Sequence, residues 1–439
     1  MRRPTIRCRH RPERTSRRRR PRPAPRTFFP SPANCNAMLT GLRILDLSRI
    51  LAGPWCTQLL ADYGADVVKV EKPGIGDDTR RWGPPFLDTA DGDAVAAYFL
   101  CCNRGKRSLA LDFTTADGQA VLQRLAAQAD VLVENYLPGT LARYGLDYAS
   151  LAAANPRLIY CSISGFGQDG PNAQRAGYDA MIQAEAGLMS LTGTAEGGPM
   201  KVGVAVSDLM CGMYAASAIL AALHERTRTG RGSHLDLALF DCQVAWLANQ
   251  GMNYLVGGAV PERHGTAHPN IAPYQAFATA DGHLMLAVGN DDQFRRFCAA
   301  AGLDELAADA RFATNAARVA ARDALSLAIA RHLAQQPTRD WLARFAAAGV
   351  PAGPVNDLAA VFAHPQVAAR GLCVEQEHAR WGSLPQIANP LRRDARPRLA
   401  ARPPPALGQH SAEVLAELGL DAAESAGLFA RGVVGGPAS

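Results

Sequence analysis

Two kinds of apolar pattern alternate along the first half of the chain. Short β-branched runs, which predict strands, occupy residues 43–48, 66–71, 108–113, 130–135 and 158–166. Between them, longer-period patterns predict helices over residues 56–64 and 117–127, the first preceded by a turn at 52–54. Strands that alternate with helices are typical of a mostly parallel sheet covered on both faces. We therefore expect an α/β fold with a Rossmann-like parallel sheet in a large domain.

The segment between Lys201 and Leu223 combines two patterns around a single acid. Valines and small residues over 201–206 predict a buried strand, and an apolar, Ala-rich helix follows Asp208. Asp208 therefore lies at the junction of strand and helix. Its carboxylate has two interpretations: a helix N-cap, or a reactive group that the helix N-terminus keeps ionised.

Shifts in composition predict the domain boundaries. Residues 1–37 form a disordered Arg- and Pro-rich extension, and the large domain begins at residue 38. The remaining boundaries are a large domain over 38–235, a linker over 236–273, a small α+β domain over 274–353, a linker over 354–370 and a return to the large domain over 371–439.

The net charge of +6 arises from one end of the chain. Residues 1–37 hold twelve arginines and one acid, a net of +11, so the remainder carries +6 − 11 = −5. A mildly acidic globular part does not favour a nucleic-acid partner. The basic extension itself has three interpretations: a mitochondrial presequence, a nucleic-acid-binding arm, or sequence upstream of a true start at Met38.

Composition narrows the class of protein further. A hydrophobic content of 48% with 20% charged residues is ordinary for a globular enzyme, and no apolar run predicts a membrane span. The ten cysteines lack metal-ligand spacing, which predicts scattered thiols in a reducing compartment, no metal site and a cytoplasmic location. If the extension were a transit peptide, the location would be the mitochondrial matrix. The first strand is followed by no glycine fingerprint, so NAD is not expected.

Several ordered blocks resemble one known family. They are LDLSRILAGPWCTQLLADYGADVVKVEKPGIGDDTR, NRGKRSLALDF, VLVENYLPGTLARYGL, GYD, Asp208 and ERTRTGRG. These blocks resemble the family III CoA-transferases, which include formyl-CoA and carnitine CoA-transferases and related acyl-CoA racemases. The resemblance runs from about Leu39 into the C-terminal region. It implies an interlocked homodimer, CoA thioesters and carboxylic acids as substrates, and no tightly bound cofactor.

The resemblance also implies a catalytic residue. In this family an aspartate attacks the acyl-CoA thioester and passes through a mixed anhydride to an aspartyl-CoA thioester, and Asp208 matches that aspartate. The racemases carry a histidine where this chain has Tyr178, 30 residues before Asp208. Because tyrosine titrates near pH 10, it exchanges an α-proton poorly at neutral pH. We therefore expect transfer rather than racemisation, with the racemase activity kept as the alternative.

Positions that contact CoA in the family carry over to this chain. Leu51 and Ala52 match a loop along the cofactor, and Lys72 and Arg143 match basic residues near its phosphates. Lys106 and Arg107 are weaker candidates for that role. Further matched contacts are Leu111, Asn135, Tyr136, Leu137, Tyr178 and Asp179.

Later blocks suggest the substrates. GTAHPNIAPYQAF, GVPAGPVND and ARPPPALGQH resemble the branch that moves CoA between succinate and glutarate or hydroxymethylglutarate. The region 264–270 lacks the glycine run of formyl-CoA enzymes, so a formyl-CoA or carnitine type of transferase remains an alternative only. Arg49, His268 and Tyr274 are candidates for binding a second carboxylate of the acceptor acid.

Overall fold

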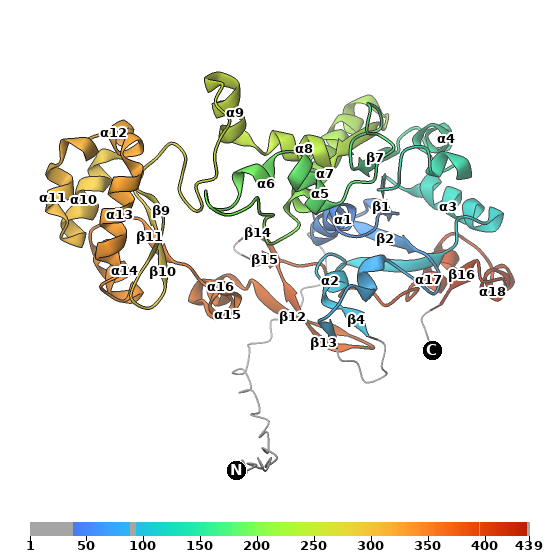
Figure 1. Cartoon of the computed structure of the whole chain (residues 1–439). Coiled ribbons are helices and arrows are strands. Elements are labelled where there is room, and N and C mark those ends of the chain that lie inside the picture. The colour runs from blue at the N-terminus through green and yellow to red at the C-terminus, as the bar shows by residue number, and fades with distance from the viewer. Residues whose placement is uncertain (1–37, 88–93, 395, 437–439) are drawn as a thin grey trace, which may run out of the picture. The chain divides into compact units, whose positions relative to one another are not determined.

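The computed structural model describes residues 38–87, 94–394 and 396–436, and every structural statement below concerns these residues. Its central sheet has the strand order β16-β5-β2-β1-β6-β7-β8 (Figure 1). Six strands are parallel, and the last, β16 (Val434–Gly435), runs antiparallel to β5. The parallel strands are β1 (Arg43–Asp46), β2 (Asp66–Glu71), β5 (Lys106–Leu111), β6 (Val131–Glu134), β7 (Ile159–Ser164) and β8 (His234–Ala238). Counted along the chain, their order is that of a Rossmann sheet, which confirms the predicted fold class.

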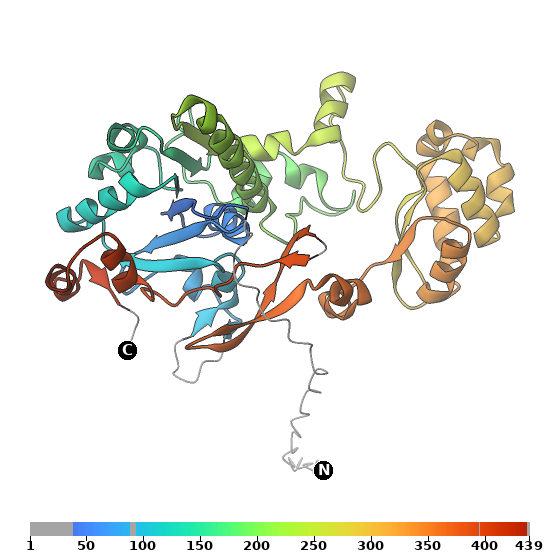
Figure 2. The same cartoon turned by 180° about the vertical axis from the view of Figure 1, so that it is seen from behind.

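Alternate strand residues enter two separate cores. Ile44 of β1 belongs to one core and its neighbour Leu45 to the other. The first core also contains side chains of α1 (Ala52–Asp62), α5 (Asp179–Glu185), α7 (Val206–Thr229) and α8 (Leu239–Ala245). The second contains side chains of α3 (Ala116–Gln128), α4 (Tyr148–Ala154), α17 (Ser411–Glu417) and α18 (Ala422–Ala430). Helices therefore cover both faces of the sheet, as Figure 2 shows from behind, which explains why the residues of its inner strands are almost all buried.

Two local predictions are wrong. The segment 201–205 forms no strand, and α7 begins at Val206, so Asp208 lies within the first helical turn rather than at a strand end. Val204 is 57% exposed, so this run has no sheet to pack against. The expected turn at residues 52–54 is also wrong, because these residues form the first turn of α1, where Pro54 loses no helical hydrogen bond.

A second, smaller sheet follows in the chain. Strands β9 (Tyr274–Ala278) and β10 (His283–Ala287) pair antiparallel and are joined by residues 279–282, and β11 (Ala352–Pro354) pairs with β10. A separate core joins this sheet to its helices. These helices are α10 (Asp291–Ala301), α11 (Asp304–Ala308), α12 (Asn315–Ala320), α13 (Arg322–Leu333) and α14 (Thr338–Ala347).

The predicted linker over 236–273 starts too early. Residues 236–238 complete β8, and α8 and α9 (Ala248–Gly257) follow, so regular structure is absent only from 258–273. Short elements complete the described chain: β3 (Phe86–Leu87), β4 (Val95–Ala96), α2 (Ala97–Leu100), α6 (Leu188–Leu191), α15 (Leu358–Ala363), α16 (Pro365–Arg370), β12 (Cys373–His378), β13 (Gly382–Ile387), β14 (Asn389–Arg393) and β15 (Arg396–Arg398). The division into a large and a small domain stays a prediction, and the extension 1–37 lies outside the described residues.

The longest helix, α7, is apolar enough by length and composition to cross a membrane. Its buried face includes Cys211, Ala215 and Ile219, which pack in the first core with side chains of α1 and the sheet. Half of the most apolar 18-residue stretch of α7 is buried within the protein. Core helices pass the same test of length and composition, so we interpret α7 as a core helix.

Candidate active site

The loops that follow β1 and β6 meet at the carboxyl end of the sheet. The chain leaves β1 towards α1 on one face and leaves β6 towards α4 on the other, so this is where the strand order reverses. The side chain of Asn135 joins the two loops, because its Oδ1 accepts from the Arg49 N–H at 2.8 Å and its Nδ2 donates to the Arg49 carbonyl at 2.7 Å. Ligands of open α/β sheets bind at such a point.

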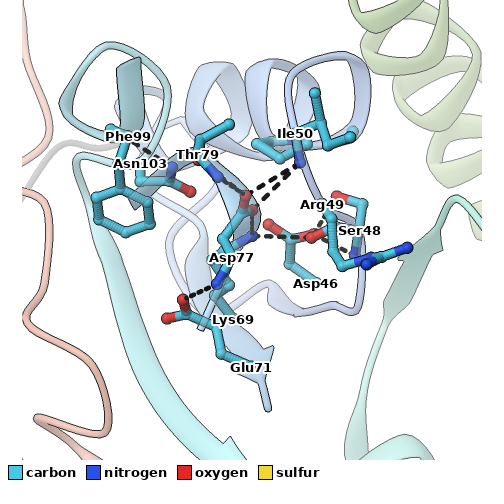
Figure 3. A network of polar contacts seen from close by, with 12 residues as sticks. Asp46, Ser48, Arg49, Ile50, Lys69, Glu71, Asp77, Thr79, Phe99 and Asn103 are labelled. Carbon is cyan, nitrogen blue, oxygen red and sulfur yellow. Dashed lines mark hydrogen bonds and ion pairs between the residues drawn. The ribbon is translucent and has the colours of Figure 1, made fainter. Parts of the chain in front are cut away.

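The loop after β1 contains an unusual backbone conformation. Ile50 has a φ of 70°, in the left-handed region that β-branched residues rarely enter. Such a conformation costs on the order of 1–3 kcal/mol and persists only where neighbouring groups hold it. Here the Ile50 N–H donates to both carboxylate oxygens of Asp77, at 3.3 and 3.2 Å (Figure 3).

A buried charge network lies beneath this loop. Its members are Asp46, Lys69, Asp77 and Lys106, and all are at most 1% exposed. Lys69 Nζ lies 2.9 Å from Asp77 Oδ2, and Lys106 Nζ lies 3.0 Å from Asp46 Oδ2. Burial raises the pKa of Asp46, but the charges of Lys106 and Lys69 outweigh it and lower that pKa to about 2. The Asp46 carboxylate is therefore charged throughout the physiological range.

Asp208 lies in a different electrostatic setting. It is 8% exposed in the first turn of α7, and the structure gives its carboxylate no ion pair. The cap of this helix comes from Asp179, whose Oδ1 accepts from the N–H groups of Ser207 at 2.8 Å and Asp208 at 3.3 Å. Burial raises the pKa of Asp208 to about 7, and the charge of Asp179 contributes. The prediction that the helix N-terminus keeps Asp208 ionised is thus wrong in direction, since burial and the like charge prevail.

Close backbone approaches bring these parts together. A Cβ atom built on Gly212 would lie 2.5 Å from the carbonyl oxygen of Ala52, so α7 and α1 touch one turn after Asp208. A Cβ on Gly177 would lie 2.4 Å from the Cα of Gly165, so the segment leading to Asp179 packs directly on the end of β7. Larger residues at these glycines would separate Asp208 from the loop after β1.

The sequence of the folded part was compared with known proteins. Residues 39–411 match the family model described as CoA-transferase family III. The chain belongs to this family. It is 52% identical over 381 residues to a succinate–glutarate CoA-transferase of Agrobacterium fabrum, covering 87% of this chain and 95% of that protein. It is 45% identical over 381 residues to the human succinyl-CoA:glutarate CoA-transferase, covering 87% and 86% respectively.

A solved structure agrees with this assignment. The crystal structure of a CaiB/BaiF family protein from Brucella suis is 51% identical, with a TM-score of 0.79 over 87% of this chain and 100% of that chain. The predicted family and enzyme class are confirmed: the protein is a family III CoA-transferase, a family that acts on CoA thioesters.

The predicted CoA contacts of this family III CoA-transferase fall into two groups. Leu51 and Ala52 start α1 directly after the Ile50 turn, and Asn135 to Leu137 follow β6 at the same end of the sheet. Lys72 and Arg143 are exposed, as phosphate-binding side chains need to be. Leu111 differs, because its side chain is 1% exposed and packs in the second core. This side chain is therefore not accessible to CoA. As CoA contacts, all of these residues stay predictions.

Two weaker candidates are excluded from that role by their ion pairs. Lys106 is fully buried against Asp46, and Arg107 is bound by Asp66, Glu413 and Glu417. Tyr178 is 57% exposed at the start of α5, so it is not a buried packing aromatic in this structure.

The candidate residues for a second carboxylate are already engaged. Arg49 pairs with exposed Asp78 at 3.1 Å and stacks over the ring of Tyr136. The rings of His268 and Tyr274 contact each other, with centroids 5.3 Å apart. Their role in substrate binding stays a prediction.

The sequence analysis missed Tyr98. Burial raises the pKa of its hydroxyl, and the negative charge of Asp208 contributes, so the two groups interact electrostatically. No local pattern around Tyr98 could have indicated this, since 110 positions separate the two residues. In the described ranges, no group of three His, Cys, Asp or Glu side chains is arranged to hold a metal ion.

Proposed function

We propose that this family III CoA-transferase moves CoA from succinyl-CoA to a dicarboxylic acid such as glutarate or hydroxymethylglutarate. The observation that carries this proposal is the 52% identity, over nearly the whole folded chain, to a protein named for transfer between succinate and glutarate. The mouse and human relatives carry the corresponding name. Other transferases at 35–40% identity are named for oxalate, mesaconate and citramalate, so the acceptor is the least constrained part.

Asp208 is the proposed nucleophile. Its carboxylate attacks the thioester carbonyl, the C–S bond breaks, and a mixed anhydride forms with release of CoA thiolate. The thiolate then attacks the Asp208 carbonyl carbon, which releases succinate and leaves an aspartyl-CoA thioester. The acceptor carboxylate repeats these steps in reverse, so the product acyl-CoA leaves and Asp208 returns as a carboxylate.

The setting of Asp208 supports this role. Burial next to Asp179 disfavours the charged carboxylate, and acylation converts it into an uncharged anhydride or thioester. A higher pKa also makes the ionised fraction a stronger nucleophile. Conversion to the acyl state therefore relieves both the desolvation of the carboxylate and its repulsion by Asp179.

Trapping the intermediate tests this proposal. The enzyme is incubated with succinyl-CoA and hydroxylamine, digested, and its peptides are analysed by mass spectrometry. We expect a hydroxamate on Asp208, formed only when acyl-CoA is present. A matched incubation with free CoA controls for non-specific modification, and labelling of another acid with Asp208 unmodified would refute the nucleophile.

The substrates are tested separately with a panel. Donor thioesters are combined with glutarate, hydroxymethylglutarate, oxalate and mesaconate, and transfer is followed by product acyl-CoA. We expect succinyl-CoA with glutarate or hydroxymethylglutarate to give the highest kcat/KM. Deuterium incorporation at the α-carbon without any acceptor would instead support the racemase alternative, which none of the relatives named above favours.

We further propose that two copies of the chain form the homodimer expected from the resemblance. Exposed apolar side chains lie on α7 and α9, and in a monomer they would contact water. These are Met213, Tyr214, Met252, Tyr254, Leu255 and Val256. Analytical ultracentrifugation should give the mass of a dimer at micromolar concentration, and a monomer there would refute this part. The cytoplasmic location stays a prediction.

A further inference from the structure

Every backbone polar group of residues 48–50 already has a partner. The Ser48 N–H donates to Asp46 Oδ1 at 3.0 Å, and the Ser48 carbonyl accepts from Lys69 Nζ at 2.8 Å. Asn135 binds both backbone groups of Arg49. The Ile50 N–H donates to Asp77, and its carbonyl accepts from the Cys102 thiol at 3.6 Å. This segment is therefore held by side chains from other elements and not by secondary structure.

The next residues differ. Among the residues that the structure describes, the N–H groups of Leu51 and Ala52 donate to no acceptor, although the Leu51 carbonyl begins α1 by accepting from Trp55. The ψ angle of Ile50 sets the direction of the Leu51 N–H, and the Ala52 N–H follows from there through the φ and ψ angles of Leu51. The left-handed turn at Ile50 thus determines how the start of α1 faces its surroundings.

Asp77 is itself held tightly. Its Oδ1 accepts from the Thr79 N–H and hydroxyl at 3.0 and 2.8 Å, and its own N–H donates to Glu71 Oε2 at 3.0 Å. Lys69, fully buried, pairs with Oδ2 and also reaches the Ser48 carbonyl. Figure 3 shows Lys69 and Asp77 beneath the backbone of residues 48–50. Because Lys69 and Glu71 both belong to β2, they hold Asp77 as a rigid acceptor for Ile50.

We propose that Asp77, anchored by Lys69, is a positioning residue for CoA binding. Its carboxylate holds Ile50 in the left-handed conformation and thereby aims the start of α1 along the cofactor. The inference rests on the proposed function, since it takes Leu51 and Ala52 as CoA contacts. Asp77 touches neither substrate nor Asp208 in this scheme. Its loss should therefore weaken ground state and transition state binding of the CoA moiety alike.

The direct test is Asp77→Asn. This change removes the charge and turns one acceptor into a donor, so it loses one bond to Lys69 or Ile50. We expect KM for succinyl-CoA, and the dissociation constant of free CoA by calorimetry, to rise about tenfold, which corresponds to about 1.4 kcal/mol. The kcat and the KM for glutarate should stay within about twofold of wild type.

Asp62→Asn is the matched control. Asp62 is also a buried carboxylate paired to one cation, Arg104, but it lies at the opposite end of α1. Both variants should lower Tm, and only Asp77→Asn should raise KM for succinyl-CoA. An unchanged KM in Asp77→Asn, or an equal rise in Asp62→Asn, would overturn the positioning role. Absence of transfer by wild-type enzyme would refute the proposed function instead.

Glycine at position 50 tests the role of the backbone conformation. Glycine enters the left-handed region without a penalty, so Ile50→Gly in the Asp77→Asn background should recover at least about threefold of the lost CoA affinity. A purely structural defect would not be rescued, because glycine further loosens the folded state. No recovery at all would exclude the conformational lock.

If Asp77→Asn does not accumulate as folded protein, Thr79→Val carries the same test. It removes only the hydroxyl bond to Asp77 Oδ1. We expect about a threefold rise in the KM for succinyl-CoA, with kcat unchanged. A KM equal to that of wild type would count against the proposal.

Discussion

Two buried carboxylates at the same end of the sheet have opposite surroundings. Asp46 is paired with Lys106 and accepts from Ser48 and Thr57, and its pKa is lowered to about 2. Asp208 is also buried but has Asp179 nearby instead of a cation, and burial raises its pKa to about 7. Burial alone therefore does not determine the state of a carboxylate, since the charges of two lysines outweigh burial at Asp46, whereas the charge of Asp179 adds to it at Asp208.

The difference separates a structural carboxylate from the proposed nucleophile. A carboxylate neutralised by lysines gains nothing from losing its charge, so Asp46 is suited to holding the loop after β1. A carboxylate beside another carboxylate becomes more stable when it loses its charge, by protonation or by acylation. The four changes below test this contrast, beginning with the largest expected effect.

Asp208→Asn should abolish transfer, with a loss on the order of a thousandfold or more in kcat, because the amide cannot form the anhydride. The same change should stabilise the fold at pH 8. The wild-type pKa lies about three units above that of an unfolded aspartate, so the penalty above pH 7 is roughly 4 kcal/mol. Urea unfolding and an initial-rate assay measure the two effects.

This gain in stability should depend on pH. The penalty in wild type is complete above pH 7 and disappears as pH falls towards the unfolded pKa, so the two proteins should converge near pH 4. An Asp208→Asn protein that is less stable than wild type at pH 8 would contradict the unpaired carboxylate.

Asp46→Asn should have the opposite effect on stability. It leaves Lys106 and Lys69 buried with less compensation, and breaking such a pair costs about 3–5 kcal/mol. Urea unfolding at pH 7 measures the loss. Asp78→Asn removes a half-exposed partner of Arg49 and should change stability by less than about 1 kcal/mol. Equal losses of unfolding free energy in Asp46→Asn and Asp78→Asn would show that the buried network contributes no more to stability than a surface ion pair.

Gly212→Ala should push α7 away from α1 and thereby separate Asp208 from the loop after β1. The new Cβ would meet the Ala52 carbonyl at 2.5 Å, a backbone atom that cannot move aside without shifting α1. We expect a loss of about 1–3 kcal/mol in unfolding free energy and lower transfer activity. Gly257→Ala, where a Cβ meets nothing within 4 Å, is the matched control and should be neutral. Wild-type stability in Gly212→Ala would show that α1 and α7 are not in contact there.

Asp179→Asn gives the smallest effect. Activity of wild type should fall as pH drops below about 7, because Asp208 becomes protonated. An amide still accepts the Ser207 N–H but carries no charge, so this acidic limb of kcat/KM should move down by about one pH unit. Glu185→Gln, an exposed acid on the same helix, should leave the limb in place. A limb that does not move in Asp179→Asn would mean that burial alone sets the pKa.

Much of this arrangement could be predicted from the sequence. Apolar runs located five of the six parallel strands, and residues 48–52 and 135–137 follow two of these strands at the carboxyl end of the sheet. Asp208 was identified by its isolation in an apolar segment and by its match to the family motif. Patterns with a period of two or 3.6 carry this information because neighbouring residues in the chain share one environment.

The rest depended on partners far apart in the chain. The cap on α7 comes from Asp179, 29 positions before Asp208, so nothing local distinguished capping from reactivity. Lys69 within an apolar strand indicates a buried partner, but not that this partner is Asp77. The run 201–205 has strand propensity and yet lacks a neighbouring strand, which shows that β-propensity reports packing and not the backbone alone.

The short antiparallel strand β16 has a consequence for synthesis of the protein. It covers the outer edge of β5 by pairing with Leu111 and Ala110 (Figure 1). Arg107 of β5 also binds Glu413, which comes 306 positions later in the chain. Until that late segment leaves the ribosome, β5 presents unpaired N–H and C=O groups to other chains. The nascent protein thus has an unpaired strand edge for most of its translation. We expect chaperones to bind it until residues 411–435 pack against β5.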